Sequence, residues 1–231
     1  MLGSAAMEKL KKAHVAVFGI GGVGSWCAEA LARSGVGALT LIDQDTVGES
    51  NINRQILALG STIGDEKSAV MARRVLDINP DCRVTALCAR YEAADRERFF
   101  GEKYDYIVDA IDLVACKVDL IISAIERGIP IVSALGTGNK LDASLLRLCD
   151  ISKTEGCPLA RVVRKELRKR GITHHAVVFS PEEGVEADQR EAPPPGRRSV
   201  PGSLVWVPAT AGLLLAQKVV LDITGTEYTK K

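Results

Sequence analysis

The sequence predicts a Rossmann-like α/β fold, with a doubly wound, mainly parallel sheet and a C-terminal extension that contains extra strands and helices. Three observations indicate this class. Short apolar runs alternate with helical patterns, a glycine-rich turn follows the first run, and an aspartate closes the second. Alternating strands and helices form parallel sheets with right-handed crossovers. The 231 residues suit one such domain, with a nucleotide-binding core at 1–135 and an extension at 136–231.

The elements of the core follow from the apolar pattern. Strands are predicted at 14–18, 38–42, 83–88, 105–109 and 129–134, and helices at 25–34, 66–78 and 113–127. Gly35 and Gly128 are placed to close two of these helices, and Asn79-Pro80 ends the third. Ligands of such sheets bind beyond the carboxyl ends of the strands, so the site is expected there.

The pattern changes after Gly136. Strands are predicted at 144–148, 176–179 and 204–207, with a helix at 158–170 and an apolar helix near 209–223 that forms either core or a dimer contact. Residues 181–202 are rich in Glu, Pro and Arg and have no periodicity. They predict a flexible loop, either an active-site flap or a connector without a catalytic part.

The glycine-rich turn is the first candidate site. Glycines allow a tight turn and a close approach to phosphate, and the next helix offers free N–H groups at its N-terminus. An acid about 20 residues further on can bind ribose hydroxyls. The sequence therefore predicts nucleotide binding, whereas the alternative is a tight turn that binds nothing. The residues of this prediction are Gly19, Gly21, Gly22, Gly24, Ser25 and Asp43.

A second group of polar residues suits a polyphosphate. Arg54 and Lys67 can neutralise charge that develops on a transferring phosphorus, and Asn51 and Gln55 can donate to phosphate oxygens. Asp112 follows the fourth strand, where a carboxylate can hold magnesium. The alternative for Asp112 is the N-cap of the helix that follows.

The overall composition limits which other classes of protein fit this chain. With a net charge of +1, the protein as a whole does not attract nucleic acid or membrane surfaces electrostatically. The segment 1–12 has no apolar stretch typical of an export signal, and the apolar run 209–216 is short for a membrane span. We therefore expect a cytoplasmic protein without membrane contact. Its six cysteines form no C-x-x-C pair, so reduced thiols are expected, with zinc on Cys149 and Cys157 as a remote alternative.

These motifs together resemble the ThiF/MoeB/HesA family of adenylating domains, which are related to ubiquitin-activating enzymes. The resemblance covers residues 3 to about 135. It rests on the glycine loop 19–25, Asp43-x-Asp45, Ser50-Asn51-x-x-Arg54-Gln55, Lys67 and Val108-Asp-Ala-Ile-Asp112. Members bind ATP and Mg²⁺, adenylate a carboxylate, and form homodimers. The resemblance implies that Asp43 and Asp45 bind nucleotide, that Asn51, Arg54, Gln55 and Lys67 contact phosphates, and that Arg54, Lys67 and Asp112 are catalytic, with magnesium on Asp112.

Two departures indicate a subgroup. The zinc-binding C-x-x-C pairs of sulfur-carrier-activating members are missing, and Lys117 stands where those members have arginine. Both features, and the stretch 150–160, resemble the tRNA threonylcarbamoyladenosine dehydratase subgroup. That subgroup uses ATP to activate the modification's carboxylate at tRNA position 37, which then cyclises with loss of water. The implied partner is tRNA bearing threonylcarbamoyladenosine, and whether a sulfur-transfer protein also docks stays open.

One helix offers independent support for RNA. The predicted helix 158–170 carries six basic residues, and spacings of three and four place four of them on one face. Such a face can contact a phosphate backbone, although a solvated helix face is the ordinary alternative. The residues predicted to contact RNA are Arg161, Arg164, Lys165 and Arg168.

Two other functions compete with this reading. An adenylyltransferase could activate the C-terminal glycine of a ubiquitin-like sulfur carrier. An NAD-dependent oxidoreductase would share the opening strand–loop–helix unit, but it would leave Arg54 and Lys67 without roles. For the preferred function, an acyl-adenylate is resolved by a nucleophile within the substrate, so neither Cys116 nor Cys157 is required.

Overall fold

The computed structural model describes residues 1–185 and 202–227. One seven-stranded sheet has the strand order β3-β2-β1-β4-β5-β7-β6, and all neighbours run parallel except β6, which is antiparallel to β7. The strands are β1 (His14–Phe18), β2 (Ala38–Ile42), β3 (Arg83–Leu87), β4 (Tyr106–Asp109), β5 (Ile131–Ala134), β6 (Arg147–Asp150) and β7 (Ala176–Phe179). The α-helices are α1 (Ser4–Lys12), α2 (Gly24–Arg33), α3 (Lys67–Ile78), α4 (Val114–Glu126), α5 (Pro158–Arg168) and α6 (Trp206–Thr224).

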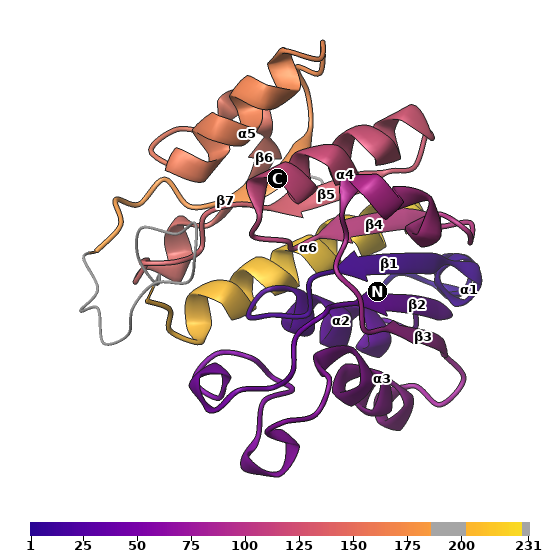
Figure 1. Ribbon diagram of the computed structural model, residues 1–231. Coiled ribbons are helices and arrows are strands. Elements are labelled where there is room, and N and C mark those ends of the chain that lie inside the picture. Colours follow the sequence, from indigo (N-terminus) through magenta and orange to yellow (C-terminus); the bar gives the residue numbers. More distant parts are fainter. Residues whose placement is uncertain (186–201, 228–231) are drawn as a thin grey trace.

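Helices cover both faces of the sheet (Figure 1). Alternate residues of each strand point to opposite faces, so the sheet supports two separate apolar cores. Val15 and Val17 of β1 belong to a core with α1, α2, α3 and α6, while Ala16 and Phe18 belong to one with α4 and α5. The strands are buried throughout β1, β2, β4 and β5, as expected for parallel strands covered on both faces.

The predicted fold class is confirmed, and so are the five core strands and three core helices, with ends that shift by one or two residues. The two glycines predicted to close helices have positive φ, 82° at Gly35 and 66° at Gly128. Glycine adopts this left-handed conformation without the steric cost of a Cβ atom, which is why it ends helices so often.

The predicted elements of the extension need correction. The strand predicted at 204–207 is wrong, because Trp206 begins the long helix α6. The strand predicted at 144–148 begins at Arg147, after a 3₁₀ turn at Ala143–Leu145. The helix predicted at 158–170 ends at Arg168. Helix α1 was not predicted. Most of the loop predicted at 181–202 lies outside the described residues.

Helix α6 is longer than the apolar run that the sequence singled out. Its 19 residues are long and apolar enough to cross a membrane by length and composition alone. However, Val207, Ala211, Leu215 and Val219 lie fully buried in the core beneath the sheet. The helix packs most closely against α2, and Gly212 makes that approach possible, because a Cβ there would lie 2.4 Å from the carbonyl oxygen of Val23.

Candidate nucleotide site

A cleft of about 710 Å³ opens at the carboxyl ends of the parallel strands. It lies where the strand order reverses between β1 and β4, which is the usual ligand position in doubly wound sheets. Most of the residues that the sequence singled out line it. They are Gly19, Gly21, Gly22, Asp43, Asp45, Asn51, Arg54, Gln55, Lys67 and Asp112.

The glycines of the loop are needed for two different reasons. A Cβ on Gly24 would lie 1.8 Å from the carbonyl oxygen of Gly19, and Gly19 itself has φ 87° and packs against the backbone of Ala110. These two glycines are required for the turn to fold. Gly21 is different, because the nearest atom to a Cβ there would be Gln55 Nε2 at 3.9 Å. The space above Gly21 is therefore open to a ligand in the cleft.

Asp43 sits at the carboxyl end of β2 and is already anchored by backbone groups. Its Oδ2 accepts from the N–H of Ile20 over 2.6 Å, and its Oδ1 accepts from the N–H of Asp45 over 2.8 Å. Burial raises the pKa of the Asp43 carboxyl. A carboxylate has about four acceptor positions, so two remain for hydroxyl groups of a ribose.

The two predicted cations are held by their own neighbours. Lys67, buried at the start of α3, donates to Asp45 Oδ2 over 2.9 Å. Arg54 donates to the carbonyl oxygen of Ser50 over 2.6 Å, and its side-chain carbons lie against Gly22. Arg54 therefore borders the glycine loop, and Lys67 lines the same cleft, where a polyphosphate would bring negative charge.

The neighbouring polar residues differ in their environment. Asn51 Oδ1 accepts from the N–H of Gly48, so part of this side chain shapes the loop. Gln55 Oε1 is buried and finds no hydrogen-bond partner among the described residues, although Gln55 lines the cleft. Ser25 Oγ is likewise buried and has no hydrogen-bond partner among the described residues. However, Ser25 and Gly24 do not line the cleft.

Asp112 is exposed on the loop between β4 and α4 and faces the cleft. The residue at the N-cap position of α4 is Leu113, one position after Asp112. Carboxylate oxygens are ligands that Mg²⁺ prefers, so Asp112 is the cleft residue that would hold such a cation beside a bound nucleotide.

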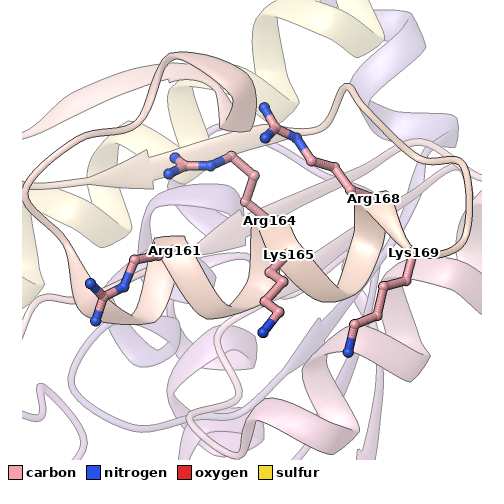
Figure 2. A pocket seen from close by; sticks show the side chains of 5 residues that line it. All are labelled: Arg161, Arg164, Lys165, Arg168 and Lys169. Atoms are coloured by element: carbon pink, nitrogen blue, oxygen red, sulfur yellow. The ribbon is translucent and has the colours of Figure 1, made fainter.

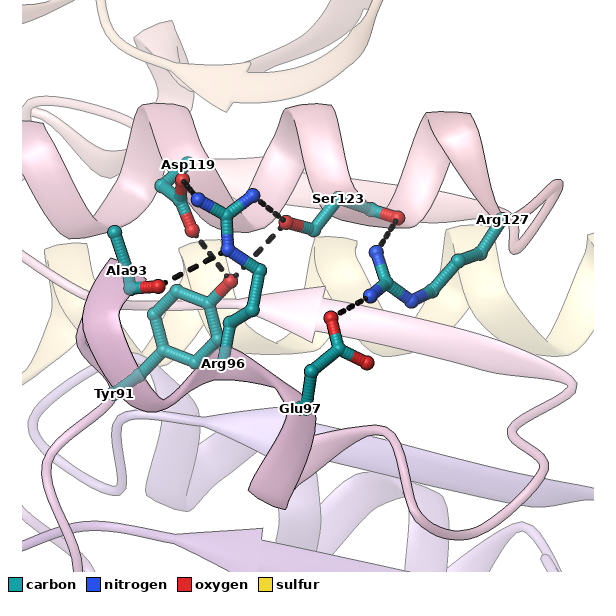
Figure 3. A network of polar contacts seen from close by, with 7 residues as sticks. All are labelled: Tyr91, Ala93, Arg96, Glu97, Asp119, Ser123 and Arg127. Atoms are coloured by element: carbon teal, nitrogen blue, oxygen red, sulfur yellow. Dashed lines mark hydrogen bonds and ion pairs between the residues drawn. The ribbon is translucent and has the colours of Figure 1, made fainter.

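One wall of the cleft was not predicted from the sequence. Ala89, Arg90 and Tyr91, which follow β3, line it together with Cys116 of α4. Figure 3 shows how this segment is attached to α4. Tyr91 donates to Asp119 over 2.8 Å, and Arg96 forms an ion pair with the same carboxylate. No sequence pattern marks this wall, because the contacts join residues about 28 positions apart.

The cysteines offer no evident nucleophile or metal site. Burial raises the pKa of the Cys116 thiol, which disfavours the reactive thiolate. Cys157 is buried, and its sulfur caps the N-terminus of α5 by accepting from the N–H of Ala160. Across residues 1–185 and 202–227, no group of three or more Cys, His, Asp or Glu side chains is arranged to hold a metal ion.

The basic residues of α5 surround a surface hollow of about 440 Å³. Figure 2 shows Arg161, Lys165 and Lys169 on one side of the helix and Arg164 and Arg168 on the other. Arg164 donates to the carbonyl oxygen of Thr154 over 2.6 Å, so its charge serves the fold. The four predicted residues therefore do not share one side of the helix, because Arg161 and Lys165 lie with Lys169, and Arg164 and Arg168 lie on the other side.

Comparison with known proteins gives consistent results. The chain is 42% identical to tRNA threonylcarbamoyladenosine dehydratase of Bacillus subtilis (strain 168), over 96% of this chain and 91% of that protein. Its structure is similar to that of the E. coli dehydratase TcdA in complex with ATP, with a TM-score of 0.87, 37% identity, and coverage of 96% and 90% of the two chains. The AMP complex of TcdA matches with the same TM-score and 36% identity, over 96% of this chain and 90% of that one.

The family assignment rests on more than these single relatives. The model of the ThiF family matches residues 1–230, which is nearly the whole sequence. The matched residues include all seven strands of the sheet and the residues that line the cleft. The chain therefore belongs to the ThiF family.

Proposed function

We propose that this chain is an ATP-dependent tRNA threonylcarbamoyladenosine dehydratase, which adenylates the carboxylate of the modified nucleoside and lets it cyclise. The observation that carries the proposal is the 42% identity to the Bacillus enzyme over 96% of the chain. It is supported by a cleft that combines an open glycine loop, the carboxylate of Asp43 and two cations.

The residues fit ATP and magnesium. Gly21 leaves room for a phosphate, and the donor Nε2 of Gln55 borders the same space, 3.9 Å from where a Cβ on Gly21 would lie. Asp43 would hold the ribose and Asp112 the magnesium ion. When bound, Mg²⁺ supplies positive charge that neutralises the phosphates and the pyrophosphate leaving group.

The chemistry then follows in two steps. An oxygen of the substrate carboxylate attacks the α-phosphorus of ATP, and the bond to the β-phosphate breaks to release pyrophosphate. A nucleophilic atom of the same modification then attacks the acyl carbon, loses its proton, and displaces AMP. The carboxylate oxygen leaves within AMP, which accounts for the net loss of water. Arg54 and Lys67 stabilise the negative charge that develops around phosphorus.

Ring closure within the substrate makes an enzyme thiol unnecessary. The raised pKa of Cys116 and the capping role of Cys157 support this route. We expect the double variant Cys116→Ser/Cys157→Ser to keep its activity if it folds. Loss of turnover in a folded double variant would contradict the thiol-free route.

The experiment that tests the function is pyrophosphate exchange into ATP with three candidate substrates. Exchange should depend on tRNA that carries threonylcarbamoyladenosine and be absent with unmodified tRNA. Exchange with a ubiquitin-like sulfur carrier, and none with modified tRNA, would instead support the adenylyltransferase alternative.

We also propose a surface for tRNA and a homodimer contact. Arg161, Lys165 and Lys169 form a basic stripe suited to a phosphate backbone. Trp206 and Leu213 of α6 are 48% and 50% exposed, and such large apolar side chains suit a homodimer contact. Light scattering in solution tests the dimer. A cytoplasmic location and docking of a sulfur-transfer protein are further parts of the proposal.

A further inference from the structure

A buried ion pair lies directly behind the cleft and takes no part in the proposed chemistry. Lys117 of α4 donates to Asp109 Oδ2 over 2.6 Å, and both side chains are 0% exposed. A buried pair adds little net stability compared with apolar residues of the same size, because both charges lose their hydration. Its location therefore points to a role in positioning.

The other oxygen of the carboxylate holds the cleft loop. Asp109 Oδ1 accepts from the N–H of Ile111 over 3.0 Å. Ile111 belongs to the loop 110–113, all of which lines the cleft and which carries Asp112. The same loop is fixed to the end of β1, where Ala110 donates to the carbonyl oxygen of Phe18. The Asp109 carboxylate thus fixes the loop on the side away from the ligand.

The groups packed around Asp109 explain why Lys117 is the cation that pairs with its carboxylate. Ser133 is the register partner of Asp109 on β5, and its hydroxyl pairs with His175 Nε2 at 2.8 Å. Burial, and then the charge of Lys117, lower the pKa of His175 to about 3. His175 is therefore neutral at physiological pH and does not compete with Lys117 for the carboxylate.

We propose that Asp109, held by Lys117, is a positioning residue that fixes the loop 110–113 and so places Asp112 for a divalent cation bound with the nucleotide. This inference rests on the proposed function, because it assumes the ATP and magnesium site. Neither Asp109 nor Lys117 is assigned a contact with the nucleotide, so both act through the loop.

The test compares two double variants that leave no buried charge unpaired. Asp109→Asn/Lys117→Met keeps an acceptor for the N–H of Ile111, whereas Asp109→Ala/Lys117→Met removes it. Binding of Mn²⁺ is measured by electron paramagnetic resonance in the presence of a non-hydrolysable ATP analogue. Binding of the same analogue without metal is measured by calorimetry. Val163→Ala, a buried α5 position outside the cleft lining, controls for general destabilisation.

We expect the alanine double variant to bind Mn²⁺ about tenfold more weakly than the asparagine one, since outer-shell partners commonly change metal affinity by about that factor. Metal-free binding of the analogue should differ much less between the two variants, because Asp109 is bonded to Ile111 of the loop and is not part of the cleft lining. Equal Mn²⁺ affinity of the two double variants, or an equal loss in Val163→Ala, would overturn the inference. If the unmodified chain binds no metal with the analogue, the proposed function is wrong and the inference falls with it.

Discussion

At the scale of single residues, glycines three positions apart in one loop have different roles. Gly24 is required by the fold, because any side chain there would collide with the backbone of Gly19. Gly21 faces the open cleft and has no such neighbour. The sequence pattern treats both alike, and only the packing around each one separates them.

This difference predicts opposite results for two alanine substitutions. Gly21→Ala should leave the folded state intact but weaken ATP binding, because the added methyl group occupies the space above the loop. Gly24→Ala should destabilise the fold by several kcal/mol or prevent folding, since overpacking against backbone cannot relax easily. Thermal unfolding and nucleotide titration of both variants check this. Full ATP affinity in Gly21→Ala would place the phosphates elsewhere.

Lys67 offers a second residue-scale prediction. Lys67→Ala should lower pyrophosphate exchange about a hundredfold, as removal of one electrostatic stabiliser commonly does. The fold should survive, because its partner Asp45 is 55% exposed and can be solvated. Lys12→Ala, at an exposed position of α1, is the control. Full exchange in Lys67→Ala would remove this residue from the proposed mechanism.

Protonation of His175 makes the free energy of unfolding depend on pH. Its pKa in the folded state is about 3, below its ordinary value of 6.5. The unfolded chain therefore binds a proton that the folded chain resists, and stability falls as the pH drops from 6.5 toward 3, by up to about 1.4 kcal/mol per pH unit. His175→Gln should flatten this dependence in urea unfolding, with exposed His174→Gln as the control. If the pH dependence of the unfolding free energy is unchanged in His175→Gln, other titratable groups control it.

At the scale of elements, the basic residues of α5 and its C-cap differ in what holds them. Arg164 is tied to Thr154. Lys165 and Lys169 point to the other side of the helix, where the exposed Lys169 also pairs with Glu166 over 2.7 Å (Figure 2). This division follows from what packs beneath the helix and cannot be read from spacing alone.

The stripe can be tested with matched lysine pairs. Lys165→Ala/Lys169→Ala should weaken tRNA binding and reduce the slope of log affinity against log salt by about 2, since each phosphate contact contributes roughly one unit. Lys11→Ala/Lys12→Ala removes two exposed lysines from α1, on the other face of the sheet. If both double variants change the salt slope equally, the change reflects the lower net charge of the protein. In that case α5 is not the surface that contacts tRNA.

The secondary-structure elements differ in how clearly their sequences predict them. The strands of the core were predicted because an apolar run covered on both faces has a clear signature. The strand predicted at 204–207 failed because a short apolar run that opens a buried helix looks the same. Helix α1 was missed because only Ala6 and Leu10 are buried in it, which leaves a weak apolar pattern.

At the scale of the whole molecule, the cleft joins parts that are far apart in sequence. Asn53, in the loop after β2, donates to the carbonyl oxygen of Ser203 near the start of α6. Thr137, Gly138 and Ser203 line the same cleft as the glycine loop. The part of the cleft lined by the glycine loop and by residues 43–67 was predictable, because these residues follow the first two strands in recognisable motifs. The remaining walls were not, because they depend on tertiary contacts.

The complete reaction can be followed through both of its products in one assay. The chain is incubated with ATP, magnesium and tRNA bearing threonylcarbamoyladenosine, and the digested nucleosides are analysed by mass spectrometry together with released AMP. We predict that this nucleoside loses the mass of one water in step with AMP release, and that unmodified tRNA supports neither change. AMP release without that mass change, or no turnover of a chain that binds both ATP and the modified tRNA, would contradict the proposed function.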